Sequence, residues 1–266
     1  MPTTVFFAAG AKHWPDYEGP ITDLAVEAGV KISLSDKAPD PAKVDVIVTA
    51  PGGIVQDYAP FTNAKLVQNL WAGVEVLVKN ETLTQPLCRM VDPAMTESMT
   101  EFVVGHVLRH HLGMDTHIKG QDGIWRAGSV PPLARWRRVT VLGLGELGAA
   151  AGRALARLNF PVTGWSRSQK SIEGLTCLSG DDGLAKALVR ADILVSLLPN
   201  TPATTNLLNA ERLAQMPRGA AIITPGRGSL IDDEALLAAL NSGQIGHATL
   251  DVFRQDVPSV ERLLPE

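Results

Sequence analysis

The sequence predicts an α/β protein of two domains, each built on a doubly wound parallel sheet. Apolar β-type runs alternate with helical patterns along the 266 residues, as expected for parallel β-α-β units. The chain is 45% hydrophobic and 20% charged, which is typical of a globular protein. A glycine-rich turn, residues 143–148, joins an apolar run to a strong helix-forming stretch. Together these observations favour a sheet that carries a ligand at the ends of its strands.

The first domain is predicted to span residues 1–98. The breakers Pro51-Gly52-Gly53 separate two of its strands, and Gly29 is a natural end for its helix. A loop is expected over 14–17. The expected strands are 3–8, 44–49, 65–70 and 87–91, and the expected helix is 21–28.

Residues 99–137 are predicted to form an interdomain helix followed by a dimerisation arm. Apolar positions at helical spacing predict a long helix over 96–112. Glycines and prolines interrupt any pattern over 119–138, where Trp125 and Trp136 suggest packing against another surface. A homodimer is therefore the expected assembly.

The second domain is predicted to span residues 138–266. Its helix 231–240 begins with acidic residues and stops at Gly243, as favoured by the helix dipole and by C-capping. Further strands are expected at 160–165, 192–198, 220–224 and 247–253, and further helices at 149–157 and 181–190.

The glycine turn predicts a dinucleotide site. Gly143 allows a tight turn, Gly145 lets a pyrophosphate approach the backbone, and Gly148 lets helix and strand pack closely. The phosphates would sit on N–H groups at the positive end of the following helix. The predicted cofactor-binding residues of the turn are Gly143, Leu144, Gly145, Glu146, Leu147 and Gly148.

The end of the next strand favours NADP over NAD. NAD sites usually place an acidic residue there to hold the ribose 2′-hydroxyl. This chain instead has Ser166, Arg167 and Ser168, with Lys170 close by, which suit a 2′-phosphate. We expect NADPH to be preferred, with NAD as the alternative.

Composition and charge exclude several other functions. A net charge of −4 gives no basic surface for nucleic acid or an anionic membrane, and no apolar stretch could span a bilayer. The start of the chain lacks a basic leader, and Cys88 and Cys177 stand alone, so a cytoplasmic protein is expected. Four histidines on or near the long helix leave a metal cluster open, but no metal-binding motif appears and no metal site is predicted. They are His106, His110, His111 and His117.

Three segments that follow the glycine turn in order point to a family. These are residues 197–205 (LLPNTPATT), 224–229 (TPGRGS) and 250–253 (LDVF). With the glycine turn they resemble the D-isomer-specific 2-hydroxyacid dehydrogenases, closest to those that reduce glyoxylate and hydroxypyruvate, through residues 89–97 and 143–148. The resemblance implies two Rossmann-like or flavodoxin-like domains, the first for substrate and the second for NAD(P).

The resemblance also implies an activity and the residues that carry it. Hydride would pass from the nicotinamide to the keto carbon of a small 2-keto acid. Arg227 would bind the carboxylate and polarise the ketone. The backbone of Ala72, Gly73 and Val74 would bind the substrate carboxylate. Further implied cofactor contacts are Leu198, Pro199, Thr205, Pro225, Gly226 and Asp251.

The end of the chain leaves two functional interpretations open. The family orients a catalytic histidine with a carboxylate, and Asp256 stands where a Glu is expected. The family's Pro-His segment does not follow, so the second domain is expected to be incomplete at its carboxyl end. The chain is then either a reductase or a non-catalytic NADP-binding protein. A short-chain reductase is disfavoured because no Tyr-x-x-x-Lys pair follows the glycine turn.

Overall fold

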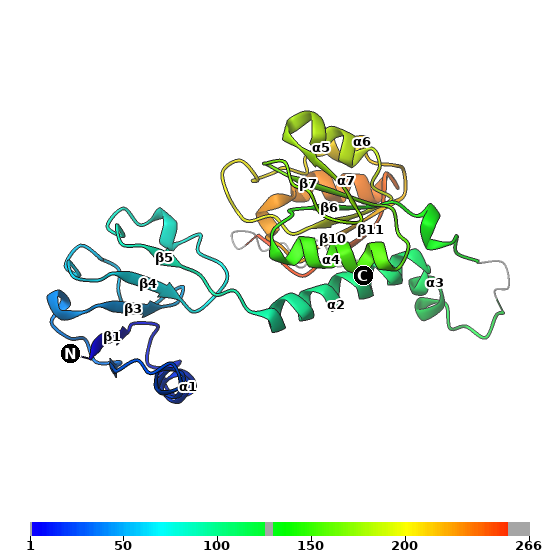
Figure 1. The fold of residues 1–266 in the computed structure, drawn as a ribbon. Coiled ribbons are helices and arrows are strands. Elements are labelled where there is room, and N and C mark those ends of the chain that lie inside the picture. Colours follow the sequence, from blue (N-terminus) through cyan, green and yellow to red (C-terminus); the bar gives the residue numbers. More distant parts are fainter. Residues whose placement is uncertain (1, 126–129, 255–266) are drawn as a thin grey trace. The chain divides into compact units, whose positions relative to one another are not determined.

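The computed structural model describes residues 2–125 and 130–254, which form two compact units, Met1–Asp92 and Pro93–Glu266 (Figure 1). Each unit contains one parallel sheet with helices, so the α/β fold class predicted from the sequence is confirmed. The division falls between residues 92 and 93, whereas the sequence placed it after residue 98. The long helix therefore belongs to the second unit.

The first unit has a five-stranded sheet in the order β2-β1-β3-β4-β5. Every neighbouring pair is parallel, and this is the flavodoxin-like order. The strands are β1 (Thr3–Phe7), β2 (Ile32–Ser35), β3 (Val46–Thr49), β4 (Leu66–Asn69) and β5 (Leu87–Cys88).

Helix α1 (Trp14–Glu27) covers one face of this sheet and corrects a prediction. The loop expected over 14–17 is helical, because Pro15 occupies the first turn, where its missing N–H is not needed. Trp14 and Tyr17 pack edge-on and tilted against Phe7 of the core. Strand β2, which the sequence did not predict, follows this helix. The short 3-10 turns η1 (Pro41–Lys43) and η2 (Leu77–Lys79) complete the unit.

The second unit has a six-stranded parallel sheet in the order β11-β10-β9-β6-β7-β8. The chain starts at the central strand β6, builds outward through β7 and β8, and then returns to β9 on the other side. The strand order therefore reverses between β6 and β9. The strands are β6 (Val139–Leu142), β7 (Val162–Ser166), β8 (Leu175–Ser179), β9 (Ile193–Ser196), β10 (Ala220–Thr224) and β11 (Ile245–Leu250).

Helices cover both faces of the second sheet (Figure 1). Helices α2 (Pro93–His111) and α4 (Glu146–Arg157) share a core with Val139 and Val141 of β6. The opposite face packs Leu142 and its neighbours against α5 (Gly180–Leu188), α6 (Ala210–Gln215) and α7 (Asp233–Asn241). This alternation along β6 is the period-two pattern of a strand buried on both faces.

The connector after α2 carries exposed apolar side chains. It contains α3 (Met114–Lys119) and the turn η3 (Ala134–Trp136). Trp125 is 89% exposed and Trp136 is 70% exposed, so most of each side chain is uncovered by the described part of the chain. No helix in the described ranges is long and apolar enough to cross a membrane.

Candidate functional site

The glycine turn after β6 is shaped by contacts that only glycine permits. Gly143 has φ +101° and donates its N–H to the Trp165 carbonyl at 2.8 Å. A Cβ on Gly143 would lie 2.8 Å from the Leu197 carbonyl oxygen, and a Cβ on Gly148 only 1.8 Å from the Gly143 oxygen. Gly145 caps α4 and has open space where a Cβ would be. The turn is therefore in close contact with the protein backbone at Gly143 and Gly148, and it has free space at Gly145, where α4 begins.

This geometry fits a dinucleotide. The first turn of α4 presents N–H groups that have no partner within the helix, and the helix dipole favours an anion there. Because nothing in the described chain lies within 4 Å of a Cβ placed on Gly145, a pyrophosphate can approach the backbone at that residue. Leu144 is buried against Gly164 of β7, while Glu146 and Leu147 begin the helix.

The loop after β7 presents a cation. Ser166 is buried, and its hydroxyl donates to the Ser168 carbonyl at 2.7 Å. Arg167, Ser168 and Lys170 are exposed. Since the Ser166 proton is already used within the loop, the other three side chains are the ones that can donate to an anion in this conformation.

Gln169 holds this loop on the neighbouring strand. Its amide nitrogen donates to the carbonyls of Lys170 at 3.0 Å and Cys177 at 3.2 Å. Its amide oxygen accepts from the Ser179 hydroxyl at 2.9 Å. Sequence reasoning missed Gln169, because a glutamine in an exposed loop carries no motif.

The loop after β9 leaves the sheet beside the glycine turn. Leu197 donates its N–H to the Leu142 carbonyl at 2.8 Å, and Leu198 is buried. Pro199 is exposed, and its carbonyl accepts from the Thr204 hydroxyl at 2.6 Å. The Thr205 hydroxyl, also exposed, donates to a carbonyl within the same loop. The loop is thus closed on itself by its threonines.

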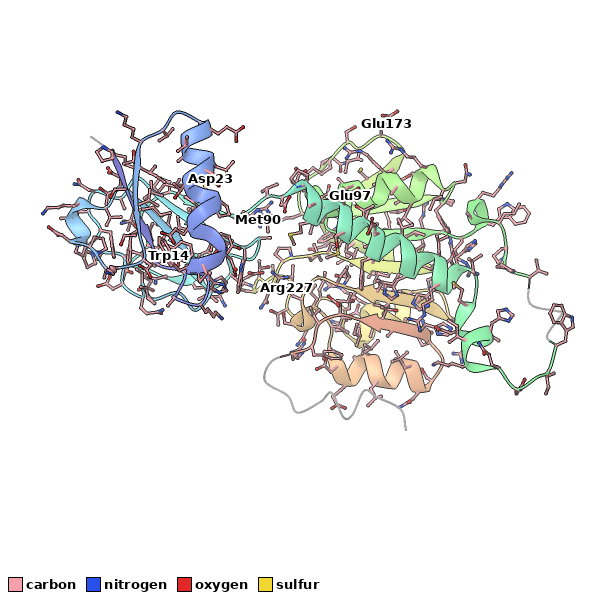
Figure 2. All side chains as sticks on the ribbon, turned by 90° about the horizontal axis from the view of Figure 1, so that it is seen from below. Trp14, Asp23, Met90, Glu97, Glu173 and Arg227 are labelled. Carbon is pink, nitrogen blue, oxygen red and sulfur yellow. The ribbon has the colours of Figure 1, made fainter. Side chains whose placement is uncertain are left out.

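The loop after β10 presents Arg227, which is labelled in Figure 2. Pro225 and Gly226 are buried, and a Cβ on Gly226 would lie 2.9 Å from the Ser196 carbonyl oxygen. The strand ends of β9 and β10 are therefore drawn close together. Arg227 is half-buried, and its Nη1 donates to the Gly226 carbonyl at 2.7 Å.

The end of β11 completes this edge of the sheet. Asp251 is exposed, and its N–H donates to the Thr224 carbonyl at 3.2 Å. Burial and the charge of Arg109 lower the pKa of His106 on α2, and the Asp251 carboxylate opposes that shift. Asp256, expected from the sequence to orient a catalytic base, lies outside the described residues.

Arg254 fastens the segment after β11 to the loop that follows Arg227. It donates to the Ile231 carbonyl at 2.6 Å and to the Ser229 carbonyl at 3.3 Å. A Cβ on Gly228 would lie 2.2 Å from the carbonyl carbon of Phe253, so the two segments touch. Only the fold brings these segments together, and no sequence signal identifies Arg254.

In the first unit, Asn69 shapes the turn at residues 72–74. Its buried side chain donates to the carbonyls of Trp71 at 2.7 Å and Gly73 at 2.8 Å. The N–H groups of Ala72, Gly73 and Val74 donate to no protein atom among the described residues. The turn follows β4, so it presents backbone donors at the carboxyl edge of its own sheet.

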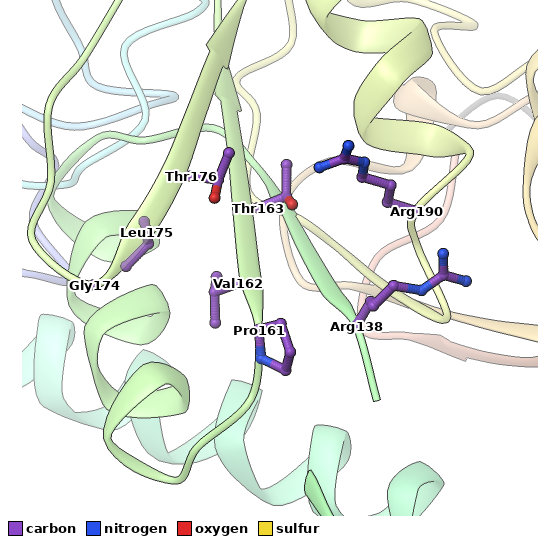
Figure 3. A pocket seen from close by; sticks show the side chains of 8 residues that line it. All are labelled: Arg138, Pro161, Val162, Thr163, Gly174, Leu175, Thr176 and Arg190. Carbon is purple, nitrogen blue, oxygen red and sulfur yellow. The ribbon is translucent and has the colours of Figure 1, made fainter. Parts of the chain in front are cut away.

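The sequence-predicted cofactor residues of the second unit lie at the carboxyl ends of strands β6, β7, β9, β10 and β11 or in the segments that follow them. The carboxyl edges of such sheets bind ligands where the strand order reverses, here between β6 and β9. A cavity of 660 Å³ lies at the opposite edge of the sheet. Its lining includes Thr163 and Thr176 of adjacent strands, together with Arg138 and Arg190 (Figure 3). That cavity contains none of the predicted site residues.

The chain is similar to several known proteins. Residues 103–265 match the NAD-binding domain of the D-isomer specific 2-hydroxyacid dehydrogenases. The chain is 36% identical over 204 residues to glyoxylate/hydroxypyruvate reductase A of Yersinia enterocolitica. That alignment covers 72% of this chain and 64% of the relative, so it spans less than two thirds of the relative's length.

Two solved structures resemble the whole chain. A D-isomer specific 2-hydroxyacid dehydrogenase of Xanthobacter autotrophicus Py2, in complex with NADPH and MES, is 39% identical with a TM-score of 0.87, covering 97% of this chain and 83% of that one. The NADPH-dependent glyoxylate/hydroxypyruvate reductase of Sinorhizobium meliloti, in complex with NADP and sulfate, is 30% identical with a TM-score of 0.78. It covers 100% of this chain and 83% of the other.

Proposed function

Because this chain belongs to the D-isomer specific 2-hydroxyacid dehydrogenase family, we propose that it reduces a small 2-keto acid, glyoxylate or hydroxypyruvate, with NADPH as the reductant. The observation that carries the proposal is the position of Arg227, at the end of β10 on the same sheet edge as the glycine turn. A guanidinium at that edge suits an anionic substrate beside a bound dinucleotide.

The residues of the second unit have separate tasks in this proposal. The first turn of α4 holds the pyrophosphate, and Leu198, Pro199, Thr205, Pro225, Gly226 and Asp251 border the rest of the cofactor. Bound NADPH would supply the hydride to the carbonyl carbon, and water would supply the proton that converts the carbonyl oxygen to a hydroxyl group. Arg227 holds the substrate carboxylate and stabilises the negative charge that develops on the ketone oxygen. The amides of residues 72–74 bind a carboxylate.

Arg167 is proposed to select NADP over NAD. It is exposed in the loop after β7, with Ser168 and Lys170 beside it, and the Xanthobacter and Sinorhizobium relatives were solved with NADPH and NADP. Arg167→Ala should raise the dissociation constant for NADPH about tenfold or more and leave that for NADH unchanged. Nicotinamide fluorescence titrations measure both. Arg190→Ala removes an exposed arginine at the other sheet edge and is the control. Tighter binding of NADH than NADPH by the unaltered chain would refute this preference.

Arg227 is tested by a change that keeps its charge. Arg227→Lys should lower kcat/KM for glyoxylate and hydroxypyruvate roughly 30- to 1,000-fold, about 2–4 kcal/mol, because the two-pronged contact is lost. NADPH consumption with each keto acid gives the rates. Arg218→Lys, in the turn that precedes β10, is the matched control. NADPH binding without turnover of either keto acid would instead identify a cofactor-binding protein.

We also propose that residues 99–137 mediate a homodimer. Ile118, Ile124, Trp125, Leu133 and Trp136 are between 56% and 89% exposed, an apolar surface that a second copy would cover. Light scattering should give the mass of two chains. Trp125→Ser should shift the mass toward one chain, and an unchanged dimer in that variant would argue against this arm.

A further inference from the structure

Three side chains far apart in the sequence converge on the second unit. His110 lies on α2, Asp115 on α3 and His247 on the edge strand β11. One potential ligand atom from each lies within 4.8 Å of the other two. We propose that His110, Asp115 and His247 bind a divalent transition-metal ion such as Zn²⁺. This site is separate from the residues proposed for keto-acid reduction.

Neighbouring groups hold two of the three ligands in place. Arg109 donates to a single oxygen of Asp115, from Nε at 2.8 Å and from Nη2 at 2.6 Å. The second carboxylate oxygen therefore stays available to a metal. Nε2 of His110 lies 2.9 Å from the Thr249 hydroxyl, which fixes the orientation of the ring. Such outer contacts are typical of metal ligands, because they reduce the cost of ordering the site.

The protonation states suit a metal. Burial, followed by the charge of His247, lowers the pKa of His110 to about 4, so its ring is neutral at pH 7. The Arg109 hydrogen bond lowers the pKa of Asp115, which is therefore a carboxylate. A metal needs a neutral imidazole and an ionised carboxylate, and neither group must lose a proton first. The Arg109 charge is already balanced by Asp115.

The other histidines of this region take different roles. The His111 ring packs edge-on against Phe160 at 5.0 Å, and the His106 ring lies 4.4 Å from that of Phe102. The ring of His110 instead lies 5.4 Å from that of His247. The helical spacing of the histidines thus gives no cluster by itself. The partner of His110 comes from a strand 137 residues later in the chain, as the numbering of the two residues shows.

Two imidazoles and one carboxylate select the type of ion. This set is used for Zn²⁺ and similar ions, whereas Ca²⁺ and Mg²⁺ prefer oxygen ligands alone. His247 is exposed, so it can move toward the other two ligands, and water can complete a four-coordinate shell. A bound ion would fasten the edge strand β11 to α2 and α3.

Titration of the metal-free full chain with Zn²⁺, followed by calorimetry, tests the site. We expect one ion per chain. His247→Ala should weaken binding by more than tenfold, since losing a direct ligand costs at least as much as losing an outer contact. His117→Ala, which removes a histidine of α3 outside the cluster, should bind as the unaltered chain does. Equal affinity of His247→Ala and the unaltered chain, or no saturable binding by the unaltered chain, would overturn the proposal.

Co²⁺ gives a second readout. Visible absorption bands of a four-coordinate ion should appear with the unaltered chain and with His117→Ala, and be lost with His247→Ala. Saturating Zn²⁺ should also raise the unfolding temperature, because an ion that binds only the folded state stabilises it. Because His247 is exposed and its side chain makes no hydrogen bond within residues 2–125 and 130–254, its replacement should leave the fold intact, which circular dichroism checks. A rise in unfolding temperature that persists in His247→Ala would count against the site.

Discussion

Within each unit, an aspartate links two neighbouring strands at the amino edge of the sheet through a backbone hydrogen bond. In the first unit, Asp45 precedes β3 and accepts the N–H of Thr4 in β1 at 2.9 Å, with Lys65 at 3.1 Å. In the second unit, Asp192 precedes β9 and accepts the N–H of Arg138, just before β6, at 2.8 Å. Arg138 also reaches Asp192 with two side-chain nitrogens, at 2.6 and 3.1 Å.

The carboxyl edges of the two sheets differ. In the second unit, glycines directly after the strand ends let backbone segments touch, as at Gly143 and Gly226. In the first unit, the Asn69 side chain binds carbonyl groups of the turn, and the N–H groups of residues 72–74 have no partner in the described chain. The amino edge therefore repeats one structural contact in both units, whereas the carboxyl edges differ in how the backbone is arranged.

The largest expected loss of stability and of NADPH binding comes from a substitution in the glycine turn of the second unit. Gly148→Ala should destabilise the second unit by about 3 kcal/mol or more and abolish NADPH binding, because the new Cβ would overlap the Gly143 carbonyl. Thermal unfolding and nicotinamide fluorescence measure both. Gly145→Ala is the control: it has space for a Cβ, so stability should hold while NADPH binding weakens. Equal stability of the two variants would contradict the packing role of Gly148.

A smaller loss of stability is expected from a substitution at Asn69, which supports the turn at residues 72–74 in the first unit. Asn69→Ala should destabilise the first unit by about 2 kcal/mol, because two carbonyls lose their partner. Keto-acid binding should weaken while NADPH binding is unchanged, as separate titrations would show. Gln68→Ala removes only one bond to a neighbouring carbonyl and serves as the control. Loss of NADPH binding in Asn69→Ala would show that the two edges are not independent.

The pKa shifts of Asp192 and Asp45 predict how the stability of each unit changes in acid. Burial raises the pKa of Asp192, but the hydrogen bonds from Arg138 outweigh it, so the pKa lies below the ordinary 3.8. Its stabilisation is complete above pH 3.8 and is lost as the pH falls below that value. Asp192→Asn should cost about 1–2 kcal/mol at neutral pH, and the difference from the unaltered chain should shrink in acid. Melting curves from neutral pH to pH 3 give this difference.

Asp45 provides the matched comparison. Its pKa is also lowered, first by the Thr4 hydrogen bond and then by that of Lys65. Asp45→Asn should show the same sign with a smaller change in unfolding temperature, because Lys65 is 78% exposed whereas Arg138 is 46% exposed. A larger loss in Asp45→Asn than in Asp192→Asn would reverse this ranking.

The smallest effect is expected in the loop after β7. Gln169→Ala should raise the KM for NADPH a few-fold more than that for NADH, since the loop that carries Arg167 loses its bonds to β8. Ser171→Ala, which alters a neighbouring exposed residue, is the control. A uniform change for both cofactors would mean that Gln169 affects the sheet rather than the loop.

The central strands, the glycine turn and the edge strands β5 and β11 could be predicted from the sequence, but the edge strands β2 and β8 could not. Strands β6, β9 and β10 are buried on both faces, so they appear as apolar runs. Strands β2 and β8 lie at sheet edges and are only partly buried. Their pairing with a neighbouring strand, rather than their own composition, makes them strands. The start of α1 was missed because Trp14-Pro15-Asp16-Tyr17 was interpreted as a loop, whereas Pro15 fits the first turn of a helix.

By itself, the sequence determined the α/β class, the glycine turn and the family motifs, because each requires particular residue types at fixed local spacing. Only the tertiary structure decided which distant groups meet. It brought Arg254 to the loop after Arg227 and His247 to His110. These contacts depend on the order of strands in the sheet, and residues so far apart leave no local pattern in the chain.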